Sequence, residues 1–301
     1  MRRRITFKQQ DTQLLQSQHL PLDEIASFTM MPAETKAQII ISAPHGGICY
    51  PNDVLSLDET HLMKFRSLED TATSLIATSL HNDSRPVILA NLARGIIDLN
   101  RPSDALDPAM YDGDIKSITT SPDYAPYVTA GYGVMPRLSA QRQALYDEKL
   151  PLSFARELVS RFYTPYHDRL AETLSSAKDG CLLVDIHSMP DNTSSKPLPD
   201  FVFGDDHGVT LPHQYRAIID AFMKDTDYSF GWNYPYAGGY ITRNYGHRTG
   251  RHYSLQIEIN RALYCTNNHR YSPHAVREVT GLLEALISHL EASMASVMAA
   301  Q

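Results

Sequence analysis

Two histidines stand at the ends of predicted strands and have the chemistry of metal ligands. His45 follows the β-branched run at residues 38–43, and His187 ends the apolar run at residues 180–187. A neutral imidazole is a good zinc ligand, and hydrolytic zinc sites use three protein ligands and keep a fourth position for water. Either histidine alone could equally be a hydrogen-bonded loop residue, so the spacing leaves both interpretations open.

The third ligand of such a site is often a carboxylate, and the sequence offers two. Glu69 and Asp70 stand at the start of a predicted helix over residues 68–80, where the helix dipole favours negative charge. The spacing does not choose between them. Asp185 lies on the same side of its strand as His187 and is predicted to fix the tautomer of that imidazole.

Three arginines and an asparagine are candidates for holding an anionic substrate. Arg94 and the pair Asn100-Arg101 flank an apolar stretch, and Arg243 follows a glycine-rich turn. Arginine binds carboxylates through a bidentate fork and can stabilise an oxyanion formed at a carbonyl. The alternatives are a structural ion pair between Arg94 and Asp98, and a solvated loop position for Arg243.

Glu258 is the candidate general base. It lies in a predicted strand at residues 253–259 with isoleucine on either side. Desolvation raises the pKa of a carboxyl group, which suits a base that takes a proton from the attacking water and passes it to the leaving amine. A salt bridge between Glu258 and Arg261 is the alternative.

The elements that must position these side chains alternate along the chain. Strands are predicted at residues 38–43, 86–92, 180–187, 201–204 and 253–259, and helices at 68–80, 140–176, 213–223 and 276–298. The segment 95–102 is predicted to continue or follow the second strand, and 103–138 to form a long functional loop. This order predicts an α/β fold with a mixed, mostly parallel sheet flanked by helices on both faces, and a site at the carboxyl ends of its strands.

The chain of 301 residues suits a single domain over residues 37–301, with residues 1–36 as an N-terminal extension packed on it. Its hydrophobic fraction of 43% is ample for a packed core.

Composition excludes several classes of function. The net charge of −7 and the lack of a basic run argue against nucleic-acid binding. No apolar stretch is long enough to cross a membrane, and no signal-like apolar segment follows the N-terminus, so we expect a cytoplasmic protein. The three scattered cysteines form no C-x-x-C pair. Neither a G-x-S-x-G elbow nor an H-E-x-x-H motif is present.

Taken together, the motifs resemble the N-formylglutamate amidohydrolase family. Their order and spacing fit from about residue 38 to residue 264, and it is the combination that is specific. The segments that carry the resemblance are 44–47 (PHGG), 69–70 (ED), Arg94 with 97–102 (IDLNRP), 163–167 (YTPYH), 185–188 (DIHS), 238–243 (GGYITR) and 256–258 (QIE).

The resemblance implies a relation to zinc carboxypeptidases and aspartoacylase, with a phosphorylase/hydrolase-like fold. It implies one zinc ion per chain, held by His45, His187 and either Glu69 or Asp70. Glu258 then matches the general base, and Arg94 the arginine that polarises the scissile carbonyl.

The resemblance also implies a substrate. Asn100 and Arg101 match residues that hold the substrate carboxylate, and Arg243 is a candidate for a side-chain carboxylate. The expected reaction converts N-formyl-L-glutamate and water to L-glutamate and formate, within histidine degradation. The expected partner is a small anionic N-acyl amino acid, bound by a monomer or a homodimer.

One departure from the wider group keeps other functions open. That group has a glutamate ligand three residues after its first histidine, where this chain has Ile48. The alternatives are an amidase or carboxypeptidase for other N-acyl amino acids or peptides, and an inactive binding homologue.

Overall fold

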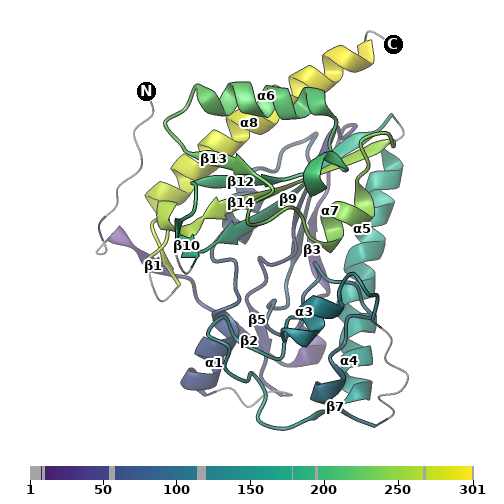
Figure 1. Cartoon of the computed structure of the whole chain (residues 1–301), viewed down its shortest axis with the longest axis vertical. Helices are drawn as coiled ribbons and strands as arrows, with labels where there is room; N and C mark the ends of the chain where they lie inside the picture. The colour runs from purple at the N-terminus through teal and green to yellow at the C-terminus, as the bar shows by residue number, and fades with distance from the viewer. Residues whose placement is uncertain are drawn as a thin grey trace.

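A seven-stranded sheet forms the centre of the computed structural model, which describes residues 8, 11–53, 58–113, 120–177, 179–193, 196–266 and 269–299 (Figure 1). The strand order is β13-β12-β14-β9-β4-β6-β3. Four neighbouring pairs are parallel, and β12–β14 and β3–β6 are antiparallel. The predicted mixed, mostly parallel sheet is therefore confirmed. The strands are β3 (Phe28–Met31), β4 (Ile39–Ala43), β6 (Val87–Ala90), β9 (Cys181–Met189), β12 (Phe201–Gly204), β13 (Phe230–Trp232) and β14 (His252–Asn260).

The central strands send alternate side chains to opposite faces of the sheet. Ile41 of β4, Val184 of β9 and Ile257 of β14 belong to one apolar core, whereas Ile40 and Leu183 belong to the other. Side chains alternate because the strand repeats every two residues. The two faces can therefore differ in chemistry although the same strands build them.

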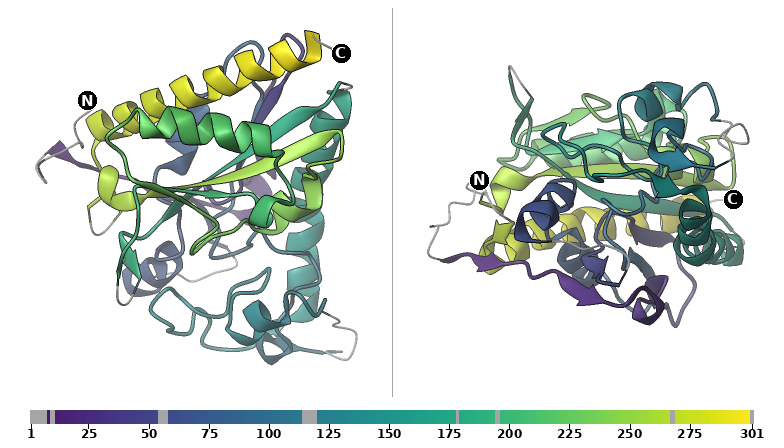
Figure 2. Two further views of the ribbon diagram at one scale, coloured as in Figure 1. Left: turned by 45° about the horizontal axis from the view of Figure 1, so that its top comes forward. Right: turned by 90° about the horizontal axis from the view of Figure 1, so that it is seen from below.

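Helices cover both faces, as predicted (Figure 2). The first core contains side chains of α2 (Thr73–Ser79), α6 (His213–Lys224) and α8 (Pro273–Ala299). The second contains side chains of α4 (Leu152–Leu158), α5 (Thr164–Ser176) and α7 (Tyr240–Tyr245).

Smaller elements surround this frame. The helices among them are α1 (Glu59–Arg66) and α3 (Ala125–Thr129), with a π-helical turn at Val159–Tyr163 and 3-10 turns at Leu22–Glu24, Pro108–Met110, Asp206–Gly208 and Arg261–Leu263. The short strands are β1 (Gln13–Leu14), β2 (Gln18–Leu20), β5 (Cys49–Pro51), β7 (Tyr111–Asp112), β8 (Leu150–Pro151), β10 (Asn192–Thr193), β11 (Lys196–Pro197) and β15 (Arg270–Tyr271).

The segment predicted as an N-terminal extension contributes to the sheet. Its β3 is the edge strand beside β6, and its β1 pairs with β15 near the start of α8. Residues 1–7 of this segment lie outside the described residues.

The helix predicted over residues 68–80 is wrong in its first part. The structure has α2 from Thr73 only, and Ser67 is the C-cap of α1. Ala72 adopts a left-handed conformation with φ of 64°, which interrupts a right-handed helix. Glu69 and Asp70 therefore lie in the turns between α1 and α2.

Two further predictions fail for local reasons. The segment 95–102 forms turns and no strand, although it buries Ile96, Ile97 and Leu99. In the sequence, this run of apolar residues therefore has the same pattern as a buried strand. Residues 140–149 are not helical, and α4 begins only after Pro151, while the chain stays helical through Pro165 because the π-helical turn leads into α5.

The predicted loop at 103–138 packs against the body of the protein. It contains α3 and buries Met110, Val134 and Met135 in the second core. Tyr127 and Tyr132 from this loop line the cleft described below. Among the described residues, no helix is both long and apolar enough to span a bilayer.

Candidate active site

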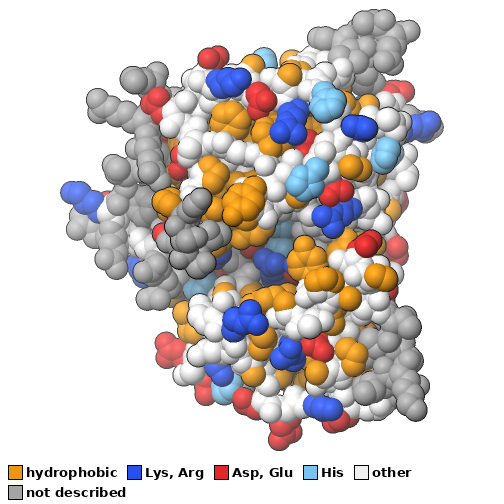
Figure 3. All heavy atoms as spheres, in the orientation of Figure 1, with side chains coloured by type: hydrophobic (Ala, Val, Ile, Leu, Met, Phe, Trp, Pro, Cys, Tyr) orange, Lys and Arg blue, Asp and Glu red, His pale blue; other side chains and the backbone are white. Residues whose placement is uncertain are grey.

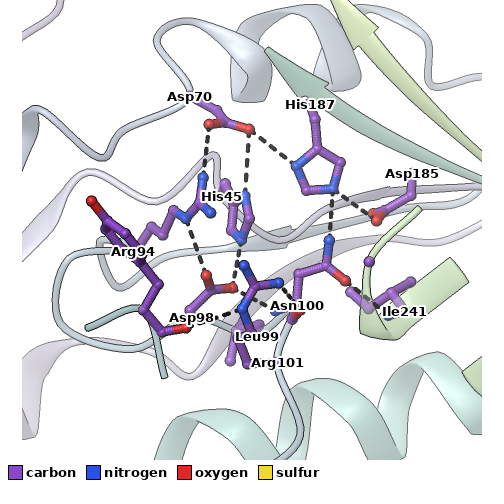
Figure 4. Close-up of polar contacts among 12 residues, drawn as sticks. His45, Asp70, Arg94, Asp98, Leu99, Asn100, Arg101, Asp185, His187 and Ile241 are labelled. Carbon is purple, nitrogen blue, oxygen red and sulfur yellow. Dashed lines mark hydrogen bonds and ion pairs between the residues drawn. The ribbon is translucent and has the colours of Figure 1, made fainter. Parts of the chain in front are cut away.

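His45, Asp70 and His187 come together as a buried group of possible metal ligands (Figure 4). One donor atom from each lies within 4.8 Å of the others. The Oδ2 atom of Asp70 is 3.0 Å from His187 Nδ1 and 3.4 Å from His45 Nδ1. Residues that are 117 positions apart along the chain thus aim at one point.

Different elements deliver the three side chains. His45 lies in the turn after β4, His187 is inside β9, and Asp70 lies between α1 and α2. The turn after β4 needs glycine, because a Cβ on Gly47 would lie 2.1 Å from the carbonyl oxygen of Leu92. Asp70 is held in place by the backbone N–H of Ser188, which donates to its Oδ2 at 3.1 Å.

The other ring nitrogen of each histidine is bound by a second carboxylate. His45 Nε2 donates to Asp98 Oδ1 at 2.7 Å, and His187 Nε2 donates to Asp185 Oδ2 at 2.8 Å. Such contacts set the tautomer of metal-binding histidines and raise their basicity. Both Nδ1 atoms are thereby directed to the shared point beside Asp70.

The donor set fits a divalent metal ion. His45 Nδ1 is buried and has no hydrogen-bond partner, which is costly for a polar atom unless something else binds it. Two imidazole nitrogens and one carboxylate oxygen are the usual protein ligands of a hydrolytic metal centre. The cluster could therefore hold such an ion.

Charge around the cluster is tightly balanced. Burial alone would raise the pKa values of the Asp70 and Asp98 carboxyls, but the histidines and Arg94 outweigh it and hold both values well below the usual range. Burial alone would lower the pKa of His187, whereas Asp185 and Asp70 raise it well above its usual value. Asp70 and Asp98 therefore remain ionised, and metal binding requires this of the ligand Asp70.

The structure separates the two carboxylates that the sequence left as alternatives. Glu69 accepts a hydrogen bond from the hydroxyl of Tyr50 at 2.6 Å and pairs with Arg66 at 3.2 Å. Its side chain is thus bound elsewhere, and Asp70 alone of the two joins the histidines.

Glu258 lies beside His187 in the sheet register and on the same face. Gln256 donates from Nε2 to Glu258 Oε1 at 2.8 Å. Burial raises the pKa of Glu258 to about 7. The predicted isoleucine neighbours do not cause this burial, because Ile257 and Ile259 belong to the core on the opposite face.

Arg94 faces the cluster and bonds to two of its carboxylates. Its Nε donates to Asp98 Oδ2 at 3.2 Å, and its Nη1 donates to Asp70 Oδ1 at 3.4 Å. The predicted pairing of Arg94 with Asp98 is therefore present, and Arg94 also lines the cleft.

Asn100 is buried and its orientation is fixed. Its Oδ1 accepts the backbone N–H of Ile241 at 2.8 Å, and its Nδ2 is 3.3 Å from His187 Nε2. Gly239 allows this approach, because a Cβ there would lie 2.2 Å from the amide nitrogen of Asn100. His167 holds the residue before Asn100, because its Nε2 lies 2.9 Å from the carbonyl oxygen of Leu99.

The other two predicted substrate residues line the same cleft with different partners. Arg101 stacks on Tyr127, with its Cζ 4.5 Å from the ring centre, and donates to the carbonyl oxygen of Tyr132. Arg243 is 37% exposed and pairs with Asp206 at 3.0 Å.

These residues line one cavity of about 650 Å³, which Figure 3 shows as a hollow with basic side chains inside it. Its described lining includes four arginines and only two carboxylates, Asp70 and Glu258. An acidic protein has thus concentrated positive charge at one place, which suits an anionic ligand.

The sequence analysis missed several residues of this site. Asp98 was considered only as a partner of Arg94, although it also binds His45. Gln256 could have been found because it lies two residues before Glu258 and so on the same strand face. Nothing in the sequence pattern singles out Tyr236, which follows a cis-proline turn and lines the cavity.

Comparison with known proteins identifies the relatives of this chain. Residues 37–265 match the family model described as N-formylglutamate amidohydrolase. N-formylglutamate deformylase of Pseudomonas aeruginosa is 27% identical over 267 residues, covering 85% of this chain and 90% of that protein. The protein of the same name from Pseudomonas putida is 26% identical over 256 residues, covering 81% and 86%.

Solved structures agree with this result. The crystal structure of N-formylglutamate amidohydrolase from Ralstonia eutropha JMP134 has a TM-score of 0.77 and 28% sequence identity, covering 87% of this chain and 96% of that one. A gene product of Agrobacterium tumefaciens has a TM-score of 0.65 at 17% identity, covering 91% and 98%, and shows the shared fold alone.

Proposed function

The chain belongs to the N-formylglutamate amidohydrolase family, and on this premise we propose that it hydrolyses N-formyl-L-glutamate to L-glutamate and formate. The observation that carries the proposal is the convergence of His45, Asp70 and His187 at an arginine-lined cleft. Proteins named N-formylglutamate deformylase align over most of the chain, which supports the same bond and substrate.

We propose that the ion at this centre is zinc. His45 Nδ1, His187 Nδ1 and one oxygen of Asp70 would hold it, with Asp98 and Asp185 orienting the imidazoles. When bound, a zinc ion lowers the pKa of a coordinated water and polarises a carbonyl. The presence of Asp70 removes the main support for an inactive homologue, which was the lack of a carboxylate three residues after His45.

Glu258 is proposed as the general base. Its Oε1 accepts a hydrogen bond from Gln256, which leaves Oε2 to take a proton from the attacking water. The water oxygen bonds to the formyl carbon, the carbon–nitrogen bond breaks, and Glu258 returns the proton to the leaving nitrogen. A pKa near 7 suits both the acceptance and the return of this proton.

The arginines and Asn100 bind and orient the substrate in this proposal. Arg94 uses Nε and Nη1 for carboxylates, so Nη2 is left to donate to the formyl oxygen as negative charge develops there. Arg101 and Asn100 hold the α-carboxylate. Arg243 was predicted to hold a side-chain carboxylate, but Asp206 neutralises much of its charge at the cleft rim.

The test is a metal analysis of the purified chain combined with a formate-release assay on N-formyl-L-glutamate before and after chelation. About one zinc per chain and chelator-sensitive formate release would support the proposal. Bound zinc without formate release would contradict N-formyl-L-glutamate as the substrate but would still support the metal centre. A protein that releases formate at full rate after complete metal removal would contradict the mechanism.

A second candidate function is hydrolysis of longer N-acyl amino acids or peptides. It is favoured by the size of the cavity, about 650 Å³, because sites of this volume accommodate ligands larger than one amino-acid derivative. Faster turnover of N-formyl dipeptides than of N-formyl-L-glutamate would establish this function in place of the first.

A further inference from the structure

The four arginines of the cleft differ in whether acidic side chains of the protein already neutralise their charge. Arg94 bonds to Asp70 and Asp98, and Arg243 pairs with Asp206. Arg101 makes no ion pair with a described carboxylate, but it stacks on a tyrosine ring and donates to two carbonyl oxygens. Of these three, Arg94 and Arg243 were assigned a ligand other than the α-carboxylate, and both already have acidic partners.

Arg261 is the fourth, and the mechanism above does not use it. It lines the cavity together with Glu258 and His187 and is half-buried. Its guanidinium makes one hydrogen bond among the described residues, from Nη1 to the backbone carbonyl of Glu69 at 3.1 Å. It makes no ion pair with the carboxylates of the described chain, and its Nε is buried without a partner.

The position of Arg261 is fixed by the backbone around it. It begins the 3-10 turn directly after β14, where Asn260 Oδ1 accepts the N–H of Ala262 at 3.0 Å. The carbonyl oxygen of Arg261 accepts the N–H groups of Tyr264 and Cys265 at 3.1 and 2.7 Å. An arginine held this firmly loses little additional entropy when it binds a ligand.

Arg261 and Arg101 approach the metal-ligand group from different elements. Arg261 bonds to Glu69, the residue before Asp70, whereas Arg101 follows Asn100, whose amide lies beside His187 Nε2. Among the described residues, the cleft thus offers two arginines that make no ion pair, one bonded to the residue before Asp70 and one that follows Asn100. A half-buried, incompletely bonded guanidinium is best satisfied by a carboxylate, which accepts two parallel hydrogen bonds.

We infer that Arg261 binds the side-chain carboxylate of a dicarboxylic N-acyl amino acid and, in place of Arg243, sets the preference for an acidic side chain. This inference rests on the proposed function for the identity of the substrate. It assigns the side-chain carboxylate to Arg261, a residue that the motif resemblance does not single out.

The test compares N-formyl-L-glutamate with its neutral isostere N-formyl-L-glutamine. Arg261→Gln is expected to lower kcat/KM for N-formyl-L-glutamate about 10- to 100-fold, the usual size of a charge-assisted hydrogen bond, and to change N-formyl-L-glutamine less than about threefold. Arg169→Gln, which removes a surface arginine paired with Glu172, is the matched control and should alter neither value. Thermal melting and metal content establish that each variant is folded and loaded.

Three outcomes would overturn the inference. Arg243→Gln could abolish the preference for glutamate while Arg261→Gln keeps it, which would return the role to Arg243. Arg261→Gln could lower kcat/KM equally for both substrates, which would make the role of Arg261 structural. Arg261→Lys, which keeps the positive charge, could lose more of the preference than Arg261→Gln, which would exclude a role for that charge.

A binding experiment separates this inference from the proposed reaction. Calorimetry on the wild-type protein compares glutarate, which has two carboxylates, with butyrate, which has one. Tighter binding of glutarate that Arg261→Gln removes would support the inference even if N-formyl-L-glutamate is not hydrolysed. Equal binding of both acids by the wild-type protein would contradict it.

Discussion

The two faces of the central sheet are made by the same strands and have different chemistry. On the face covered by α2, α6 and α8, the central strands present mostly apolar side chains, such as Val184 and Leu255. On the other face, β9 carries Cys181 and Leu183 first and then Asp185 and His187, while β14 carries polar side chains that include Gln256 and Glu258. One face therefore stabilises the fold, while the other changes along its length from core to site.

This comparison explains why polar residues can be buried here without destabilising the protein. Ser42, Asp185 and His187 are all nearly inaccessible to solvent, yet each is hydrogen-bonded to another of the site residues. Buried polar groups are tolerated when their hydrogen bonds are satisfied. The apolar face packs tightly and keeps the strands rigid. The opposite face of the same strands can therefore hold several charges in fixed positions.

The largest expected effect comes from removing the carboxylate of the metal-ligand group. Asp70→Asn should abolish stable metal binding and lower formate release by about 1,000-fold or more, because a neutral amide is a poor ligand for a divalent ion. Metal content and activity are measured together. The adjacent Glu69→Gln is the matched control and should keep its metal; loss of metal from Glu69→Gln but not from Asp70→Asn would reverse the assignment.

A smaller loss is expected from the general base. Glu258→Gln should keep the metal and lower kcat by about 100-fold or more, because the amide cannot accept the proton. Steady-state kinetics with metal analysis measure this effect. Turnover close to that of the wild type would eliminate Glu258 as the base.

Substitution of Asp185, whose carboxylate binds His187 Nε2, should have an intermediate effect on metal affinity. Asp185→Asn keeps the shape of the side chain but weakens the contact that orients the imidazole, so we expect metal affinity to fall about 10- to 100-fold. Competition with a chelator of known affinity measures the change. An unchanged affinity would show that Asp185 serves only the hydrogen bond from Ser42.

On the opposite face, a substitution should affect stability and leave catalysis intact. Leu255→Ala is expected to lower the free energy of unfolding by about 2–5 kcal/mol, because Leu255 is completely buried in the first core. Urea denaturation measures the loss, and kcat per folded molecule at 25 °C should change less than about twofold. A large drop in kcat would mean that the two faces are coupled.

Substitution of His167 is expected to have the smallest effect on activity. It should instead change how the stability of the protein depends on pH. Burial lowers the pKa of His167 to about 4, below its usual value near 6.5. The unfolded chain therefore takes up the proton first as pH falls, and the free energy of unfolding decreases from about pH 6.5 to about pH 4, by up to about 3 kcal/mol. His167→Gln should flatten this part of the stability profile, and an unchanged slope would contradict the assignment.

Sequence periodicity was sufficient for the central strands because each is either an apolar run or, in β14, an alternation of apolar and polar residues, with turns at its ends. It failed at residues 68–72 and 95–102, where irregular backbone is buried and carries apolar residues at helix-like or strand-like spacing. The left-handed Ala72 has no signal in its residue type, since alanine ordinarily favours a right-handed helix.

The sequence by itself determined the mixed α/β sheet, the histidines at the ends of two strands and the arginines around them. These follow from local patterns of polarity, which act within a few residues. Only the tertiary structure decided between Glu69 and Asp70, gave Asp98 its contact with His45 and left Arg261 without an ion pair among the described residues. Those outcomes depend on contacts between segments far apart in the chain, and the direction in which a turn aims a side chain is set by what packs against it.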